Sequence, residues 1–251
     1  MAVDIAQVRA NNPSPMTLTG TNTYVITSGE VSCVVDPGPL EAEHLDAIVA
    51  TAEQIVLVLS THRHSDHTAA VDELVTRTGA SARAISPEWC RGAEPLPNGE
   101  AIALGDTSLR ILATPGHTSD SMSVLVPEAH AVLTGDTVLG GSTTVLEYPD
   151  GTLRDYLASL DQLEKLGASR ILPGHGDEIE AGDEAVRELR EHRLSRLKQI
   201  QDALAQLGEA PRVDEGLIDR LVELIYPGVA AAGAARLSVA AQLDYLAGAS
   251  S

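Results

Sequence analysis

Four side chains of the types that bind metal ions lie within one short segment of this sequence. The segment HRHSDH, residues 62–67, contains three histidines and one aspartate directly after an apolar run. Residues two apart in an extended segment face the same way, so His62, His64 and Asp66 start on one side and a turn brings His67 round. Imidazole and carboxylate together suit zinc, iron or manganese. The segment therefore predicts a metal site rather than an ordinary polar turn.

Three more residues of the same types stand in equivalent positions farther along the chain. His117, Asp136 and His175 each come soon after an apolar, strand-like run. We expect the strands of one scaffold to bring such residues together at one edge, where loops form sites. Seven ligands exceed what one four-coordinate ion needs, but they suffice for two ions if one carboxylate bridges them. Two ions can activate a shared water as hydroxide, so the expected chemistry is hydrolysis.

The elements that must position these residues are strands mixed with helices. Helical patterns cover residues 66–78 and 152–166. Strands mixed with helices predict a layered α/β architecture. The expected strands cover residues 23–27, 31–35, 54–60, 81–86, 109–114, 122–126, 131–135 and 170–173.

The composition changes after about residue 182, and only helices are expected from there on. They cover residues 183–207, 213–226 and 237–247. We therefore expect a catalytic domain, residues 1–182, and a small C-terminal helical subdomain, residues 183–251. A chain of 251 residues is long enough for one large domain with such an addition.

Charge and cysteine content limit the partners and the compartment. The formal net charge of −19 opposes binding to a polyanion or an anionic membrane, although it also fits plain solubility. The two cysteines form no C-x-x-C pair, which fits a reducing compartment. No signal peptide or membrane-length apolar run is recognisable. We expect a cytoplasmic protein with no membrane and no stable nucleic-acid partner; a homodimer is compatible with the sequence.

Four motifs resemble those of the metallo-β-lactamase superfamily. They are THRHSDH, PGHT, TGDT and PGHG, which begin at residues 61, 115, 134 and 173. The resemblance implies an αββα sandwich with the site at one edge of its two sheets. It also implies that two ions share seven ligands. His62, His64 and His117 would hold one ion, Asp66, His67 and His175 would hold the second, and Asp136 would bridge them.

Longer segments resemble the lactamase-beta-2-like branch of that superfamily. TGTNTYVI, DPGP, TPGHTSDSMS and YPDGTLRDYLASL appear in the order of that branch. The branch includes a metal-dependent endoribonuclease that acts on single-stranded RNA. The C-terminal subdomain resembles the winged-helix subdomain of the branch, apparently truncated, because the chain leaves no room for a pair of wing strands.

The resulting expectation is a dinuclear zinc-dependent hydrolase in which a metal-bridging hydroxide cleaves an ester-like or phosphodiester bond, in a small molecule or short single-stranded RNA. Iron and manganese stay open as metals. The alternatives are a thioester or lactone hydrolase similar to glyoxalase II, and an iron-dependent redox enzyme. Asp66 and Asp136 are the expected catalytic residues, with Asp66 also passing a proton to the leaving group. The resemblance argues against β-lactamase activity, because class B enzymes with a cysteine ligand have it at the Asp136 position.

Three further residues are candidates for substrate contact. Asn22 lies in a turn that leads into a strand, and Thr143 and Thr144 end the GGSTT loop after Asp136. Asparagine is also an ordinary turn former, so a purely structural role stays open for Asn22. We expect His44, which belongs to no motif, at the surface.

Four arginines recur every third residue after the His175 turn. Because a helix turns about 100° per residue, this series spreads over a broad face. It predicts either an anion clamp near the site or a solvated face paired with neighbouring glutamates. The arginines are Arg187, Arg190, Arg193 and Arg196, and the glutamates are Glu184, Glu188 and Glu191.

Overall fold

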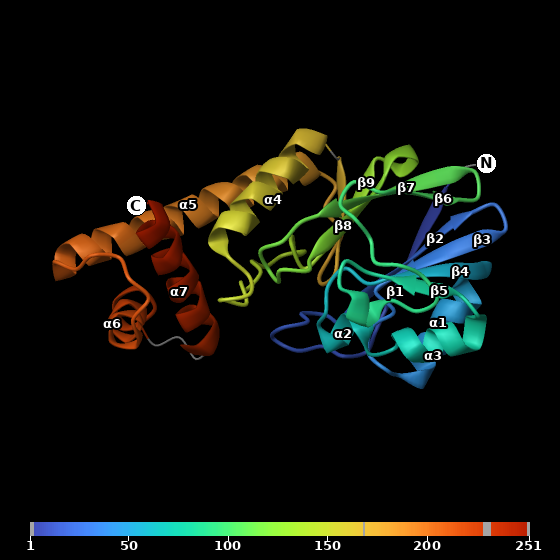
Figure 1. Cartoon of the computed structure of the whole chain (residues 1–251), viewed down its shortest axis with the longest axis horizontal. Helices are drawn as coiled ribbons and strands as arrows, with labels where there is room; N and C mark the ends of the chain where they lie inside the picture. The colour runs from blue at the N-terminus through green and yellow to red at the C-terminus, as the bar shows by residue number, and fades with distance from the viewer. Residues whose placement is uncertain (1–2, 168, 228–231, 250–251) are drawn as a thin grey trace.

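Two five-stranded β-sheets pack face to face, and helices cover the outer face of each sheet (Figure 1). The computed structural model describes residues 3–167, 169–227 and 232–249. The layers confirm the predicted αββα sandwich. The long helix α5 (Gly182–Leu207) leaves the second sheet and extends to one side, where the last two helices pack on it.

The first sheet has the strand order β1-β2-β3-β4-β5. The pairs β1–β2 and β2–β3 are antiparallel, and β3–β4 and β4–β5 are parallel. Its outer face is covered by α1 and α3, whose Leu45, Ile48 and Leu74 pack against Val34 and Val58. The bounds are β1 (Asp4–Arg9), β2 (Asn22–Ser28), β3 (Val31–Val35), α1 (Ala42–Thr51), β4 (Gln54–Leu59), α2 (Ser65–Thr68), α3 (Val71–Thr78) and β5 (Ser81–Arg83).

The second sheet has the order β10-β9-β8-β7-β6. Only the pair β9–β10 is parallel among its described ladders. Two short 3₁₀ turns, Pro87–Trp89 and Pro127–Ala129, precede β6 and β9. The strand bounds are β6 (Ala101–Leu104), β7 (Thr107–Ala113), β8 (Met122–Val126), β9 (Ala131–Gly135) and β10 (Arg170–Pro173).

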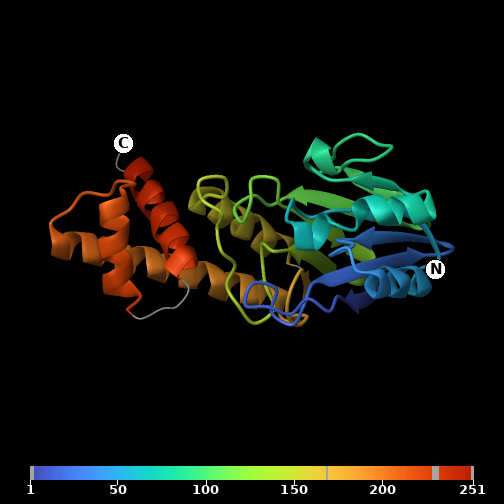
Figure 2. The same cartoon turned by 90° about the horizontal axis from the view of Figure 1, so that it is seen from below.

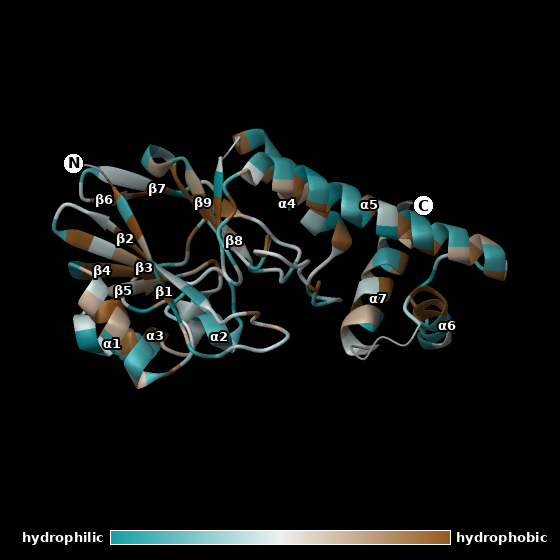
Figure 3. Ribbon diagram, turned by 180° about the vertical axis from the view of Figure 1, so that it is seen from behind, coloured by the Kyte–Doolittle hydropathy of each residue, from teal (hydrophilic) through white to brown (hydrophobic). Residues whose placement is uncertain are grey.

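The core between the sheets is aliphatic, as a chain without phenylalanine requires. Along β2, Ile26 faces the second sheet while Val25 packs under the outer helices, so this strand is buried on both faces. From the second sheet, Ile111 and Val124 meet Ile26 in the central layer. Figure 3 shows apolar residues concentrated in the strands and polar ones along α5.

Four helices complete the molecule: α4 (Leu153–Leu166), α5, α6 (Glu215–Ile225) and α7 (Ala232–Ala249). The helix α4 begins where the Thr152 hydroxyl accepts the amide hydrogen of Asp155, and it ends at Gly167 in a left-handed conformation. Figures 1 and 2 show α6 and α7 beside the part of α5 that is remote from the sheets.

A single hydrophobic cluster joins the second sheet to these helices. It contains Ile171 of β10, Leu160 of α4, Ile200 of α5, Leu221 of α6 and Leu243 of α7. The predicted boundary at residues 182 and 183 coincides with the start of α5, and the division into two domains stays a prediction. Among the described residues, no strand follows β10.

The sequence did not predict β1, β6, α1 or the two 3₁₀ turns. The predicted helix 66–78 is divided into α2 and α3. The prediction that His44 lies at the surface is wrong: it is 5% exposed, and its Nε2 lies 2.9 Å from the Thr23 hydroxyl. None of the helices within the described ranges is both long and apolar enough to cross a membrane.

Candidate metal centre

The turns that follow β4, β7, β9 and β10 converge at one edge of the sandwich, and they bring all seven predicted ligands together. The donor atoms form three groups, and within each group all atoms lie within 4.8 Å of one another. The groups are His62, His64 and His117; His62, His67 and Asp136; and Asp66, His67 and His175. The structure thus places all seven candidate ligands next to one another.

In the first cluster, formed by His62, His64 and His117, three imidazole nitrogens point at a common centre. The Nδ1 atom of His64 lies 3.1 Å from Nε2 of His62 and 3.1 Å from Nε2 of His117. The Nδ1 atom of His117 lies 2.6 Å from the Val145 carbonyl, so that nitrogen must donate its hydrogen outward. The Nε2 atom of His64 lies 3.0 Å from the Glu147 carboxylate, so it also donates its hydrogen outward. The inward nitrogens of these two rings therefore present lone pairs to each other.

In the second cluster, formed by Asp66, His67 and His175, the histidines also have their Nδ1 atoms facing outward acceptors. The Nδ1 atom of His67 lies 2.8 Å from Asp36 Oδ2, and Nδ1 of His175 lies 3.2 Å from the Gly20 carbonyl. The inward Nε2 atoms of the two rings are 3.2 Å apart, and Asp66 Oδ2 lies 3.1 Å from that of His175. Facing lone pairs and a carboxylate repel one another unless a cation lies between them.

Asp136 lies between the two clusters. Its Oδ1 is 3.4 Å from His67 Nε2, and its Oδ2 is 3.5 Å from His175 Nε2 and 3.8 Å from His117 Nε2. The Oδ1 atom is buried and accepts no hydrogen bond from any described residue. An unpaired buried carboxylate oxygen is costly, and a cation would satisfy it. The donor set therefore fits divalent metal ions.

The electrostatic environment differs between the clusters. Burial, together with the neighbouring His67 and His117, lowers the pKa of His62 well below its ordinary value. Burial alone would also lower the pKa of His67, but the carboxylates of Asp36 and Asp136 outweigh it and raise it to about 10. The first cluster therefore favours neutral imidazole, whereas the carboxylates around the second favour a positive charge there, which a proton on His67 supplies until a metal ion replaces it.

Two supporting residues were not singled out from the sequence. Asp36, which follows β3 with a left-handed φ of 54°, accepts hydrogen bonds from the Thr61 amide and hydroxyl as well as facing His67. Its place at the end of a strand is the same signal that identified the ligands. Glu147 accepts from His64 and, at 2.6 Å, from Arg63. No local pattern signals the contact with His64, because the two partners are 83 positions apart in sequence.

The predicted substrate residues occupy different places. Asn22 is fully buried, and its amide donates at 2.9 Å to the carbonyls of Pro173 and Gly176. Both amide hydrogens are therefore used to brace the turn that contains His175. Thr144 is buried, with its hydroxyl 3.1 Å from His117 Nδ1, whereas Thr143 is exposed.

A small hollow of about 50 Å³ lies beside His117 and Asp136. Thr143 and Thr144 line one side of it, and Met16, from the loop before β2, lines another. Gly174 shows how tightly this edge is packed, because a Cβ atom there would lie 2.6 Å from Asp136 Oδ1. The hollow is the space next to the metal centre into which a scissile group could reach.

Comparisons with known proteins agree with the fold. The family description "Metallo-beta-lactamase superfamily" matches residues 16–175. The Beta-lactamase-like protein 2 homolog of Caenorhabditis elegans is 33% identical over 84% of this chain and 74% of its own length. The Atrochrysone carboxyl ACP thioesterase of Aspergillus chevalieri is 34% identical over 80% of this chain and 66% of its own length.

Solved structures share the architecture. A metallo-beta-lactamase family protein from Thermus thermophilus superposes with a TM-score of 0.79 at 21% identity, over 98% of this chain and 94% of that one. TTHA1623, in a di-iron-bound form, superposes with a TM-score of 0.59 at 25% identity, over 72% of this chain and 96% of that one. The first match includes the C-terminal helices, and the second covers less of the chain.

The chain belongs to the metallo-beta-lactamase superfamily. With its histidine and aspartate clusters and relatives that include thioesterases, it is a metal-dependent hydrolase of that superfamily.

Proposed function

We propose that the protein is a dinuclear zinc-dependent hydrolase of ester-like bonds, with acyl thioesters as the favoured substrates. The observation that supports this most directly is the inward orientation of the histidine nitrogens. His62, His64 and His117 would hold one ion, Asp66, His67 and His175 would hold the second, and Asp136 would lie between them. Two zinc ions would supply a water of lowered pKa and positive charge to stabilise the transition state.

The chain's own residues would orient the substrate and move the proton. Asp66 is the ligand best placed for proton transfer, because its side chain is 28% exposed whereas those of His67 and His175 are buried. We propose that it passes a proton to the leaving group. Thr143, exposed beside the small hollow, would contact the substrate, while Thr144 and Asn22 hold the turns that contain His117 and His175.

Two considerations favour a thioester over RNA. Relatives at 33 to 34% identity are named as acyl carrier protein thioesterases. The net charge of −19 and an aromatic content of 2% disfavour binding of an extended single strand. RNA is therefore the less favoured substrate. Hydrolysis of a phosphodiester probe would distinguish RNA cleavage from thioester hydrolysis.

The test combines elemental analysis with a hydrolysis panel on freshly purified protein. The panel contains a thioester, a lactone, a phosphodiester, a cephalosporin and single-stranded RNA. We expect about two zinc ions per chain and thioester hydrolysis. His64→Ala and Asp136→Ala should stay folded but lose metal and nearly all activity, and full activity in either variant would refute the site assignment.

A redox function with iron is the second candidate. Imidazole and carboxylate ligands suit iron as well as zinc, and the di-iron form of TTHA1623 has the same fold. Zinc protein is colourless, so iron in the elemental analysis together with a visible absorption band would favour this candidate. Thioester hydrolysis by colourless protein would exclude it.

A further inference from the structure

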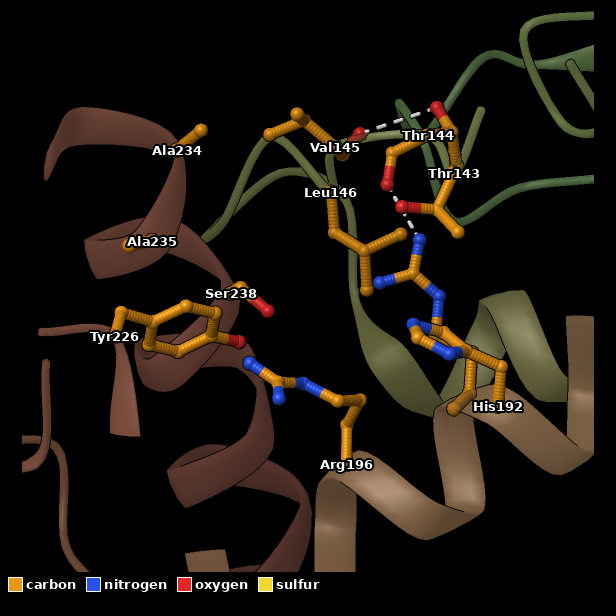
Figure 4. Close-up of a pocket in the computed structure, with 11 residues that line it drawn as sticks. Thr143, Thr144, Val145, Leu146, His192, Arg196, Tyr226, Ala234, Ala235 and Ser238 are labelled. Carbon is orange, nitrogen blue, oxygen red and sulfur yellow. Dashed lines mark hydrogen bonds between the residues drawn. The ribbon is translucent and has the colours of Figure 1, made fainter. Parts of the chain in front are cut away.

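A second, larger cavity lies between the site edge of the sandwich and the C-terminal helices. Its volume is about 340 Å³. The walls are the segment 143–146, the middle of α5, Tyr226 after α6, and the start of α7 (Figure 4). In Figure 4, Arg196 from α5 lies beneath the ring of Tyr226, and Ser238 on α7 lies beside the same ring. The helices of the tail thus complete a pocket that the sandwich alone does not form.

The four regularly spaced arginines of α5 divide into two kinds. Arg187 lies 3.5 Å from Asp183, and Arg190 lies 2.6 Å from Asp161. These two belong to a solvated, paired face, although the partners are aspartates rather than the glutamates expected. Arg193 and Arg196 instead line the cavity, and neither forms an ion pair with a described carboxylate.

The arginines of the cavity are held in place without being neutralised. Arg193 is 8% exposed, donates from Nη2 to the Thr144 carbonyl, and has a buried Nε with no hydrogen-bond partner among the described residues. Arg196 has its guanidinium carbon 4.2 Å from the centre of the Tyr226 ring, and its Nη1 donates to Gln199 at 2.6 Å. Stacked, fixed guanidinium groups are suited to carboxylate or phosphate. In a chain with a net charge of −19, two such uncompensated cations in one cavity point to an anionic ligand.

The cavity adjoins the metal centre through a shared wall. Thr143, Thr144 and Val145 line both this cavity and the small hollow that contains His117 and Asp136. The Thr144 residue touches both sides directly, since its hydroxyl lies 3.1 Å from His117 Nδ1 and its carbonyl accepts from Arg193. A substrate that crosses this segment would have one end at the metals and the other at the arginines.

We propose that the cavity is an anion-binding subsite, in which Arg193 and Arg196 bind a carboxylate or phosphate at the end of the substrate remote from the scissile bond. This inference rests on the proposed ester and thioester hydrolysis, and it narrows the substrate class to elongated anionic acyl compounds. Leu146 and Ala235 supply apolar wall for the linking part of such a substrate. Burial and the adjacent Arg193 and Arg196 lower the pKa of His192, so the arginines are the main positive charge of the cavity near neutral pH.

The test compares substrates that differ only in the remote charge. S-acetyl pantetheine is neutral and S-acetyl 4′-phosphopantetheine adds one phosphate; S-acetyl glutathione supplies carboxylates instead, and a butyryl and succinyl pair places the charge on the acyl side. We expect kcat/KM to be about tenfold higher for at least one anionic substrate than for its neutral counterpart, the size of one charge-assisted contact. Arg196→Gln should remove this preference by lowering kcat/KM for the anionic substrate toward the value for its neutral counterpart. Arg187 lies on the same helix but pairs with Asp183, so Arg187→Gln is the matched control and should keep the preference for the anionic substrate.

A second measurement does not depend on hydrolysis. Inorganic phosphate or succinate should raise the melting temperature of the wild type and of Arg187→Gln more than that of Arg196→Gln. If this difference appears but no thioester is cleaved, the subsite stands and the proposed reaction fails. If thioesters are cleaved but the anion preference and the melting shift are the same with and without Arg196, the subsite is refuted while the reaction stands.

A second variant keeps both arginines, so that the test does not depend on whether Arg196→Gln folds. Ser238 is half-buried in the cavity wall on α7, and Ser238→Asp introduces a negative charge there. This variant should reverse the preference toward the neutral thioester. An unchanged preference in folded Ser238→Asp would overturn the proposal as firmly as an unchanged Arg196→Gln.

Discussion

Replacing Asp36 with asparagine should weaken metal binding mainly at the second cluster. The Asp36 carboxylate accepts hydrogen bonds from the Thr61 amide at 2.7 Å, the Thr61 hydroxyl at 2.8 Å and His67 Nδ1 at 2.8 Å. Asparagine has one acceptor oxygen, and its amide group would face two donors. For His67 to accept from that amide, its hydrogen must move to Nε2, the nitrogen that points into the cluster. The variant therefore favours the tautomer that cannot bind metal there.

The expected magnitude follows from the burial of this contact. The side chains of His67 and Asp36 are 0% and 3% exposed, so solvent does not screen the loss. Removing such an outer partner of a metal-bound histidine lowers metal affinity by about 10- to 100-fold, or about 1.4 to 2.7 kcal/mol. The folded state should also lose about 2 kcal/mol of stability from impaired charge-assisted hydrogen bonds. This corresponds to a fall of about 4 to 8 °C in Tm for a chain of this size.

The assay is a competition titration with a chelator that resolves two binding steps. In Asp36→Asn, we expect one of the two binding steps to weaken by this factor and the other to change much less. Asp161→Asn removes a carboxylate that pairs with Arg190 on the surface of the helices, and both of its steps should match the wild type. Two unchanged binding steps in folded Asp36→Asn would refute the assignment of Asp36 as the residue that fixes the His67 tautomer.

Three further changes test other contacts. Glu147→Gln should weaken binding at the first cluster by about tenfold, the lower end of the range, because the Glu147 side chain is 45% exposed; chelator titration measures it, and a shift confined to the other cluster would contradict the reasoning. Gly174→Ala places a Cβ atom 2.6 Å from Asp136 Oδ1, so added zinc should no longer raise the melting temperature, and a full zinc-dependent rise would count against the packing argument. Leu221→Ala empties a fully buried position among the C-terminal helices and should cost about 2 to 5 kcal/mol in denaturant unfolding, with metal content unchanged; a cost below about 1 kcal/mol would show that this core collapses freely.

The positions of the candidate ligands were predictable because these residues follow strands. His117, Asp136 and His175 each lie in a turn at the end of an apolar run, and the sheets align those turns. The roles of Asn22 and Thr144 were not predictable in this way. Each makes its decisive contact across a large sequence separation, Asn22 with Gly176 and Thr144 with His117, and no local pattern encodes such a contact.

The same distinction applies to the fold. Apolar strands such as β3 and β9, with every residue but the first of β3 buried, were predicted from their composition. The edge strand β1 has no fully buried residue, so its pairing with β2 provides the order that its sequence does not indicate. The interpretation of the arginine series depended on tertiary contacts as well, because only the packing of α6 and α7 separates Arg196 from the paired arginines.

The continuous cluster from β10 through α4 to α7 has a mechanical consequence. The helices that wall the arginine cavity share one apolar interior with the sheet that supports Asp136 and His175. Hinge motion between the two halves would have to separate these packed apolar side chains. The distance between the candidate metal centre and the arginines should therefore stay constant. A substrate would then be selected by its length as well as by its charge.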